Sequence, residues 1–590
     1  MLERVEINKL YLYQRDLLFL VVLLFPIQTI LVYQKSLFST FSFYGQISSI
    51  PLLVGYVLAV VTCVREHQVK NLLFPVFTIA AFYVLLCAGI SFHSIFEYSN
   101  IGPFDATTFG ETSKTRLLKN LLVTLGVSSD AILYGSIVLM RDTLNSVREV
   151  VFAFGIVVWI AFLSRKDFLG TFETVRKAVL WSTAFLTPYI ACELMHLYGM
   201  GGATALLKTI NSSLYEPCSF LGWYPPLVSP NQIRGTWTEP AFFAIWLAFA
   251  TPFLVSSFFE GRTSSLKRAG IAFTFFMVLF SIWFMTYART SVVLIAVLLI
   301  LYFFFAIVFC SRENWRKVGI LMVAAASGIL IVSTWGQQEG SHQIPVMSTE
   351  IVAEKSAQEP TEVNVFSKMD KKNIQRGPTE SVFSSEKQSM GSELRKIKSS
   401  ISKSTLIKDS INSSIDAKSR SNPTRLEDFH LKIEIFKMHP IVGVGDTFAS
   451  FAQTRKMQQG SNGLTEENQQ RLSHTKSNGL FQSGITGFSL SIAGLLACRG
   501  LFGFSIVFVP ILFLGLVLFV CLFKVHGVSR QVGTTIFISF FASFLPAFSQ
   551  GLWYYYFWCS MGLAIAFVFQ ILKEYRLRKN CNYFKDYNRC

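Results

Sequence analysis

Apolar residues in this chain are gathered into long runs, and the segments between the runs are polar or basic. A helix of about twenty apolar residues is long enough to cross the hydrocarbon layer of a membrane. The pattern predicts twelve such helices, at residues 13–33, 47–64, 71–92, 149–164, 177–198, 239–259, 269–288, 291–310, 317–335, 501–523, 532–549 and 552–572. We therefore expect an all-α integral membrane protein with about twelve transmembrane helices and a large external loop that carries short amphipathic helices.

The basic clusters between the runs predict the orientation of the chain. They lie at residues 65–70, 164–177, 262–268, 312–317, 524–530 and 573–579. Because cytoplasmic loops carry an excess of Lys and Arg, both termini are expected in the cytoplasm and the long segments 93–148, 199–238 and 336–500 outside. Residues 121–140 are less apolar, and counting them as a span would place the basic amino terminus outside. We expect them to form an external re-entrant or interfacial helix.

Composition excludes an ordinary soluble domain. The 590 residues are 52% hydrophobic with a mean hydropathy of +0.45. A formal net charge of +17 would suggest nucleic acid in a soluble protein, but here the Lys and Arg residues stand between apolar runs. They are better explained by topology and anionic lipid, so no nucleic-acid partner is expected. The ten cysteines form no CxxC pair and no Cys/His cluster, so neither a disulfide framework nor a metal site is expected.

The chain is expected to divide at the external loops and the termini. The predicted parts are spans 1–9 in 1–335, a low-complexity external insert at 336–428, an external active-site loop at 429–500, spans 10–12 in 501–572, and a cytoplasmic tail at 573–590. The insert is rich in Ser, Lys, Glu and Gln and is predicted to be disordered, because it cannot bury enough apolar surface to fold. The aromatic run 553–558 is predicted to form a belt at the membrane interface or, alternatively, a wall on which sugars stack.

The external active-site loop opens with a helical pattern. Residues 429–438 alternate apolar and charged side chains at helical spacing, which predicts a helix lying flat at an interface. His439-Pro440 should end it, because proline does not continue a helix. Gly443-Val444-Gly445-Asp446 then gives the backbone freedom that a tight turn needs beside a ligand or another protein wall.

Two arginines at external junctions are candidate anion ligands. Arg234 precedes Thr238-Glu239-Pro240, a good helix start, and the free amides of that helix and Arg234 would point at one place where a diphosphate can bind. Arg289 lies between two apolar runs, where an arginine faces a partner or a cavity. The alternative for both is anchoring to lipid headgroups. Glu193 and His196, near the outer end of their span, are expected to face the cavity.

Four motifs in order carry a family resemblance. They are RGTWTEPAFFA at 234–244, TYARTSVVL at 286–294, HPIVGVGDTF at 439–448, and SNGLFQ followed by RGLFGF at 477–504. Together they resemble the O-antigen ligase and O-antigen polymerase family, bacterial integral-membrane glycosyltransferases that use lipid-pyrophosphate-linked sugars. The resemblance covers roughly residues 230–525. It implies a periplasmic active site at the inner membrane, where Arg234 and Arg289 match the positions of arginines that hold undecaprenyl pyrophosphate.

His474 is the candidate catalytic base, because a histidine near neutral pKa can accept the proton of an attacking hydroxyl. Family members carry the histidine directly before the asparagine, whereas here Ser477 precedes Asn478. His439 and Asn478 therefore remain alternatives. Arginines that stabilise the departing pyrophosphate would make a metal or other cofactor unnecessary.

Three further residues are candidates for substrate contacts. Glu239 and Asp446 would orient the acceptor or act as the base; alternatively they are a helix cap and a turn residue. Arg499 would add a third cation, or else anchor the following span. With Asn478, these complete the predicted set.

Within the family that the chain resembles, ligases tend to carry Asp-Pro-Asn where this chain has "TEP" after the arginine. The resemblance therefore implies a polymerase of undecaprenyl-pyrophosphate-linked oligosaccharide units. Within the same family the alternatives are an O-antigen ligase that transfers to lipid A core and a protein O-oligosaccharyltransferase. Outside it they are a transporter or flippase for lipid-linked sugars and a scaffold that recruits other assembly proteins. Expected partners are the lipid-linked oligosaccharide, membrane lipid, and a chain-length regulator or flippase.

Overall fold

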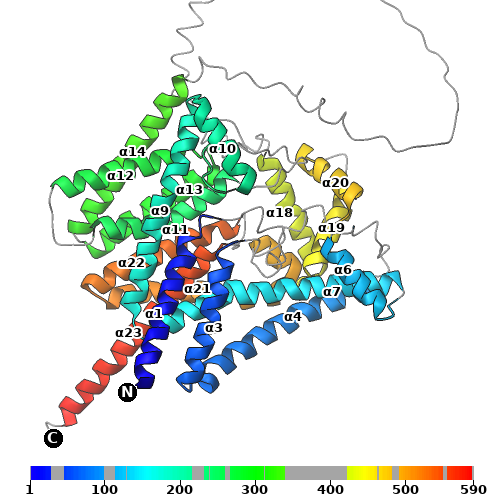
Figure 1. Ribbon diagram of the computed structural model, residues 1–590, viewed down its shortest axis with the longest axis horizontal. Helices are drawn as coiled ribbons and strands as arrows, with labels where there is room; N and C mark the ends of the chain where they lie inside the picture. Colours follow the sequence, from blue (N-terminus) through cyan, green and yellow to red (C-terminus); the bar gives the residue numbers. More distant parts are fainter. Residues whose placement is uncertain are drawn as a thin grey trace, which may run out of the picture. The chain divides into compact units, whose positions relative to one another are not determined.

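The computed structural model describes residues 2–27, 46–98, 110, 113–127, 129–214, 232–237, 239–259, 266–310, 312–338, 421–460, 464–480, 491–548 and 554–587. Across these ranges the chain forms helices and turns and no strand, which confirms the all-α prediction (Figure 1). The chain divides into two units, residues 330–417 and the remainder, and all interactions discussed below lie within the larger unit. Most of the predicted insert at 336–428 lies outside the described residues.

The chain up to residue 214 contains α1 (Leu2–Leu23), α3 (Ser49–Arg65), η2 (Val69–Leu73), α4 (Phe74–Tyr98), α6 (Ser113–Thr124), α7 (Asp130–Glu149), η3 (Val150–Phe154), α8 (Gly155–Ser164), α9 (Phe168–Leu197) and α10 (Gly201–Leu214). It is followed by α11 (Pro240–Phe259), α12 (Leu266–Phe284), α13 (Arg289–Phe309), α14 (Arg312–Gln338), α18 (Ser421–Met438), α19 (Asp446–Gln459), α20 (Glu466–Asn478), α21 (Ile492–Lys524), α22 (Gly527–Phe544), η8 (Leu545–Phe548) and α23 (Tyr555–Tyr587).

Ten helical segments among the described residues are long and apolar enough to cross a membrane. They are 69–97, 132–164, 168–197, 240–259, 267–284, 289–309, 312–334, 492–524, 527–548 and 555–577. A shorter apolar helix, Ser49–Arg65, accompanies them. The multi-pass membrane architecture predicted from the apolar runs is thus confirmed.

The first predicted span is displaced along the chain. The structure forms α1 over Leu2–Leu23, whereas the apolar pattern predicted residues 13–33, of which 28–33 lie outside the described residues. Pro26 explains the early end, because proline has no amide hydrogen and disfavours helical geometry in the residue before it.

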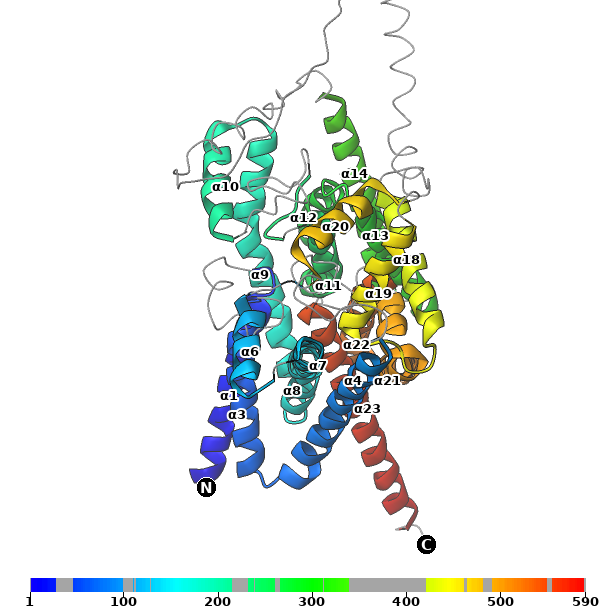
Figure 2. The same ribbon diagram turned by 90° about the vertical axis from the view of Figure 1, so that its right-hand side faces the viewer.

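Residues 121–140 do not form one helix. Helix α6 ends at Thr124, Gly126 adopts a φ of 90°, and α7 begins at Asp130. Figures 1 and 2 show α7 lying across the direction of α1 and α9. The π-helical segment η3 joins α7 to α8, which packs along α23. Residues 132–140 belong to the candidate span 132–164, and the expectation of an external re-entrant or interfacial helix at 121–140 stays a prediction.

The bundle core is aromatic and is centred on α11. This helix packs against α9, α13 and α22, and its Phe243, Trp246 and Phe249 side chains are fully buried. The aromatic run near the carboxyl end joins the same core: Tyr554 to Trp558 are all buried, and the Tyr555 hydroxyl lies 2.6 Å from Ser49 Oγ. The prediction of an interface belt at these residues is therefore wrong, because they pack inside the bundle.

Candidate functional site

The segment around Arg234 is held from both sides. The Ile233 amide donates a hydrogen bond to the Met285 carbonyl (3.1 Å), and the Gly235 amide donates to Glu193 Oε2 on α9 (2.9 Å). Trp237 stacks on Phe243, with ring centroids 5.2 Å apart. The prediction that Pro240 opens a helix is confirmed, since α11 begins there. The backbone that carries Arg234 is thus fixed against three spans.

Arg234 itself is buried, with 3% of its surface exposed. Its positive charge lies beside the Glu193 carboxylate, and its side chain interacts with the Tyr189 hydroxyl. That hydroxyl lies 2.6 Å from Asn211 Oδ1 on α10. A buried guanidinium needs such partners because removing a charge from water is costly. The sequence pointed to Glu193 but not to Tyr189 or Asn211.

Arg289 is the first residue of α13 and follows a tight turn. Thr286 Oγ1 lies 2.5 Å from Ser291 Oγ, and Tyr287 has a positive φ of 46°. Arg425, near the start of α18, lies close enough to Arg289 for the two like charges to interact. Because Met285 bonds to Ile233, this turn and the Arg234 segment are neighbours in space. The two predicted arginines therefore lie on adjoining segments, next to the start of α18.

Helices α18, α19 and α20 form a lobe that precedes α21. Asp428 on α18 accepts hydrogen bonds from Gln453 on α19 (3.2 Å) and from Arg471 on α20 (3.1 Å). Burial lowers the pKa of Lys432, while the neighbouring Asp428 acts in the opposite direction. Asp428 thereby links all three helices and fixes α20, the helix that contains residue 474.

The turn at 439–446, here called the glycine turn, packs against α21. Val444 and Gly445 amides donate to the Ala497 and Cys498 carbonyls of α21 (3.1 and 2.8 Å). In return, the Leu501 and Phe502 amides donate to carbonyls of the turn, at 2.8 and 3.0 Å. The approach requires glycine: a Cβ on Gly443, whose φ is 78°, would lie 2.4 Å from the Arg499 amide nitrogen.

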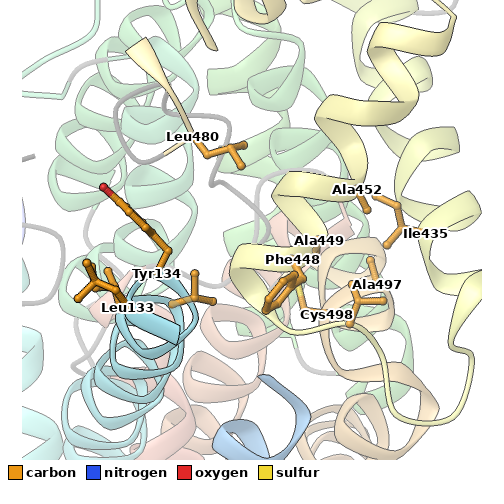
Figure 3. Packing of buried hydrophobic residues seen from close by; sticks show 12 residues of the cluster. Leu133, Tyr134, Ile435, Phe448, Ala449, Ala452, Leu480, Ala497 and Cys498 are labelled. Atoms are coloured by element: carbon orange, nitrogen blue, oxygen red, sulfur yellow. The ribbon is translucent and has the colours of Figure 1, made fainter. Parts of the chain in front are cut away.

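An apolar cluster packs around Val444 of the glycine turn. It consists of Leu133, Tyr134, Ile137, Val138, Ile435, Val444, Phe448, Ala449, Ala452, Leu480, Ala497 and Cys498 (Figure 3). These residues come from α7, α18, the glycine turn, α19, the segment just after α20, and α21. The lobe is therefore attached to the spans by a shared core as well as by backbone hydrogen bonds.

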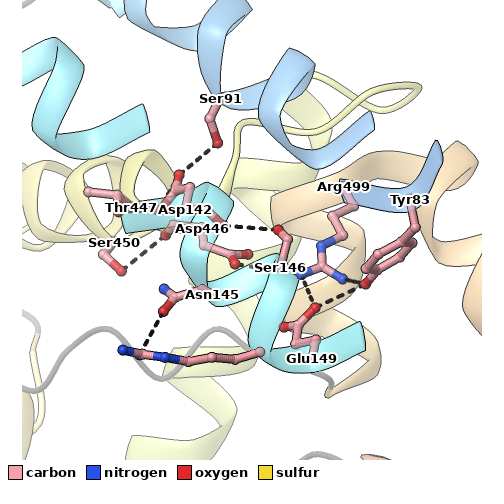
Figure 4. A network of polar contacts seen from close by, with 11 residues as sticks. Tyr83, Ser91, Asp142, Asn145, Ser146, Glu149, Asp446, Thr447, Ser450 and Arg499 are labelled. Atoms are coloured by element: carbon pink, nitrogen blue, oxygen red, sulfur yellow. Dashed lines mark hydrogen bonds and ion pairs between the residues drawn. The ribbon is translucent and has the colours of Figure 1, made fainter. Parts of the chain in front are cut away.

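A buried ion pair lies beside this cluster (Figure 4). Arg499 Nη2 is 2.6 Å from Glu149 Oε2, and both side chains are 3% exposed. The Tyr83 hydroxyl donates to the same carboxylate oxygen (3.0 Å) and also contacts Arg499 Nη1. Asp446 Oδ2, at the start of α19, lies 3.6 Å from Arg499. The pair thus joins α7, α21, α4 and the lobe.

Asp142 on α7 holds the first turn of α19. Its carboxylate accepts from Thr447 Oγ1 (2.6 Å), from the Thr447 amide (3.3 Å) and from Ser91 Oγ (2.7 Å). A carboxylate at this position satisfies an amide of the helix start and complements its dipole. Sequence reasoning missed both Asp142 and Glu149. The available signal was their spacing of seven residues, which places them on one face of a helix.

The other predicted residues have different surroundings. Arg499 contacts Glu149, Tyr83 and Asp446 and lines a cavity of only about 10 Å³, which is too small for a substrate and favours a structural role. Glu239 immediately precedes α11 and lies near Tyr554. His439 Nε2 is 3.1 Å from Glu97 Oε1. The side chains of His474 and Asn478 lie outside what the structure describes, although their backbone belongs to α20.

These features define a polytopic helical membrane protein in which two arginine-bearing junctions adjoin a helical lobe. Residues 272–474 match a family model described as O-antigen ligase. The match covers about a third of the chain, including Arg289, the glycine turn and most of α20. Over these residues the chain is similar to the O-antigen ligase family. Searches of curated proteins and of solved structures each gave no match.

Proposed function

We propose that the protein transfers a glycan from an undecaprenyl-diphosphate carrier to an acceptor hydroxyl at the periplasmic face of the bacterial inner membrane. The observation that supports this most strongly is the hydrogen bond between Ile233 and Met285, which keeps the segments bearing Arg234 and Arg289 next to each other. Two guanidinium groups on adjoining segments suit a diphosphate, because each can donate to two oxygens at once.

In the proposed reaction the acceptor oxygen attacks the anomeric carbon, and the bond from that carbon to the diphosphate oxygen breaks. The leaving diphosphate keeps the bonding electron pair, and Arg234 and Arg289 stabilise its developing charge. His474 accepts the proton of the acceptor hydroxyl. The arginines supply the positive charge that a metal ion would otherwise supply.

Arg425 adds support for an anionic ligand. Its charge and that of Arg289 repel each other, and an anion bound between them would relieve that repulsion. Because Arg425 belongs to α18, ligand binding would also draw the lobe towards the spans. The lobe then acts as a cover that orients α20 and its histidine over the donor.

We assign the protein as a polymerase, which adds one lipid-linked repeat unit to another. The support is the Thr-Glu-Pro sequence after Trp237, where ligases tend to carry Asp-Pro-Asn. A ligase that transfers to lipid A core is the second candidate, favoured by the description of the matching family model. The two differ in the acceptor and not in the arginine site.

The test uses purified full-length protein and a synthetic polyprenyl-diphosphate oligosaccharide. With a second donor molecule as the acceptor, a polymerase gives products that lengthen in steps of one repeat unit. A ligase instead needs lipid A core and gives a single transfer. Arg234→Ala and Arg289→Ala should each abolish product, whereas Arg312→Ala, at the start of α14 and beyond the far end of α13, should not. Full activity in both arginine variants would overturn the proposal.

A further inference from the structure

A second cavity lies at the other end of the bundle from Arg234 and Arg289, the proposed diphosphate site. It has a volume of about 250 Å³ and lies between the ends of α11, α13, α14 and α22. Phe309, the last residue of α13, lines it, whereas Arg289 is the first residue of the same 21-residue helix. At 1.5 Å per residue the two are about 30 Å apart, the thickness of the hydrocarbon layer. This distal pocket is therefore separate from the proposed diphosphate site.

The distal pocket has an apolar wall and a charged wall. Phe305 and Phe309 form part of the apolar wall, and Lys317 and Arg530 line the charged one. The Arg530 guanidinium carbon lies 4.6 Å from the centre of the Phe309 ring, and its Nε donates to the Val525 carbonyl (2.7 Å). These contacts hold the arginine in place. The pocket thus presents a fixed cation beside an aromatic surface.

Side chains, and not helix dipoles, make the distal pocket positively charged. The first turns of α14 and α22 and the last turns of α11 and α13 border the pocket, so their helix dipoles largely offset each other. Lys317 pairs with Glu313 (2.9 Å), which leaves Arg530 as the excess positive charge among the lining side chains. The distal pocket, at about 250 Å³, is several times larger than a water molecule, which occupies about 30 Å³. It can therefore hold a ligand larger than a single small ion. An anionic, partly apolar ligand fits both properties.

We propose that the distal pocket binds the headgroup of an anionic phospholipid. The lipid phosphate would lie against Arg530 and Lys317, and the glycerol would lie against Phe305 and Phe309. Basic pockets between membrane helices bind phosphate headgroups in this way. The pocket lies at the basic clusters 312–317 and 524–530, which are predicted to face the cytoplasm. A phospholipid of that leaflet can therefore enter it from the bilayer. The binding is independent of glycan transfer.

The test measures lipid retention by native mass spectrometry of the full-length protein in detergent. Phosphatidylglycerol should remain bound under conditions that strip phosphatidylcholine. The double variant Lys317→Gln/Arg530→Gln should weaken phosphatidylglycerol binding by about tenfold or more, because two charge-assisted contacts are lost. Arg312→Gln, an exposed cation on α14 outside the pocket, should weaken it by about fivefold at most.

A second variant keeps every charge and fills the space. Ser256→Leu, on the α11 wall, should displace the lipid while the protein unfolds at the same temperature as the parent. Equal retention in the parent, the double variant and Ser256→Leu would overturn the proposal. So would glycerol 3-phosphate binding as tightly as the lipid, because the pocket would then be a site for a soluble phosphate.

Discussion

Glu149→Gln is the most informative single change, because Glu149 joins three parts of the chain. Its Oε2 atom lies 2.6 Å from Arg499 and accepts from Tyr83 at 3.0 Å. Glutamine keeps the size and removes the charge. Among the described residues, Asp446, at 3.6 Å, is then the carboxylate that remains beside Arg499. Removing one partner of a buried ion pair costs about 3–5 kcal/mol, and Asp446 offsets part of this, so we expect a loss of about 3 kcal/mol.

The structure offers a matched control. Arg176 Nη2 is also 2.6 Å from Glu173 Oε2, but these side chains are 17% and 33% exposed. Glu173→Gln should therefore cost less than about 1 kcal/mol, because water replaces the lost partner. The double variant Glu149→Gln/Arg499→Met should lose less stability than Glu149→Gln alone, since it leaves no uncompensated buried charge.

The measurement is the free energy of unfolding in mixed micelles, from titration with sodium dodecyl sulfate followed by circular dichroism. Hydrogen exchange of the α19 amides adds a local reading, because loosening of the ion pair should raise exchange there before global unfolding. The reasoning is refuted if Glu149→Gln and Glu173→Gln lose the same stability, or if the losses of Glu149→Gln and Arg499→Met simply add.

Three further changes test other parts of the structure. Gly443→Ala should destabilise the protein by about 2–4 kcal/mol in thermal unfolding, because the added Cβ would overlap the backbone of α21. Gly460→Ala, the control, should be nearly neutral. Equal melting temperatures of the two variants would contradict the close contact between Gly443 and α21. Arg234→Lys should lower kcat by about a hundredfold or more with unchanged helicity, since ammonium cannot bind two oxygens, while Arg268→Lys retains activity. Chelator should leave transfer unchanged; activity that is lost and then restored by Mg²⁺ would contradict charge stabilisation by arginines alone.

Local signals in the sequence were sufficient for most helices and several boundaries. Apolar runs of spanning length predicted the membrane helices, because each span must bury its own backbone hydrogen bonds. Pro240 marked the start of α11, and His439-Pro440 marked the end of α18. The arginines at 234 and 289 were predicted as anion ligands because charge at the end of an apolar run is conspicuous, and that assignment stays a prediction.

Long-range pairing was not available from local patterns. Glu149 and Arg499 are 350 positions apart, and nothing near either residue identifies the other. The glycine turn was predicted to face a ligand or a wall, and only the fold showed that α21 is the wall. The aromatic run ending at Trp558 was misassigned because tyrosine and tryptophan suit both an interface and a core, and composition does not say which side of a helix is buried.

The central claim is that glycan transfer is coupled to release of the lipid diphosphate held by Arg234 and Arg289. It is tested most directly by counting both products with the purified protein in liposomes that contain lipid-linked oligosaccharide. The account predicts one polyprenyl diphosphate released for every glycosidic bond formed, and neither product with Arg234→Ala. Oligosaccharide that crosses the bilayer still attached to its lipid, with no diphosphate released, would contradict the account and indicate a transporter.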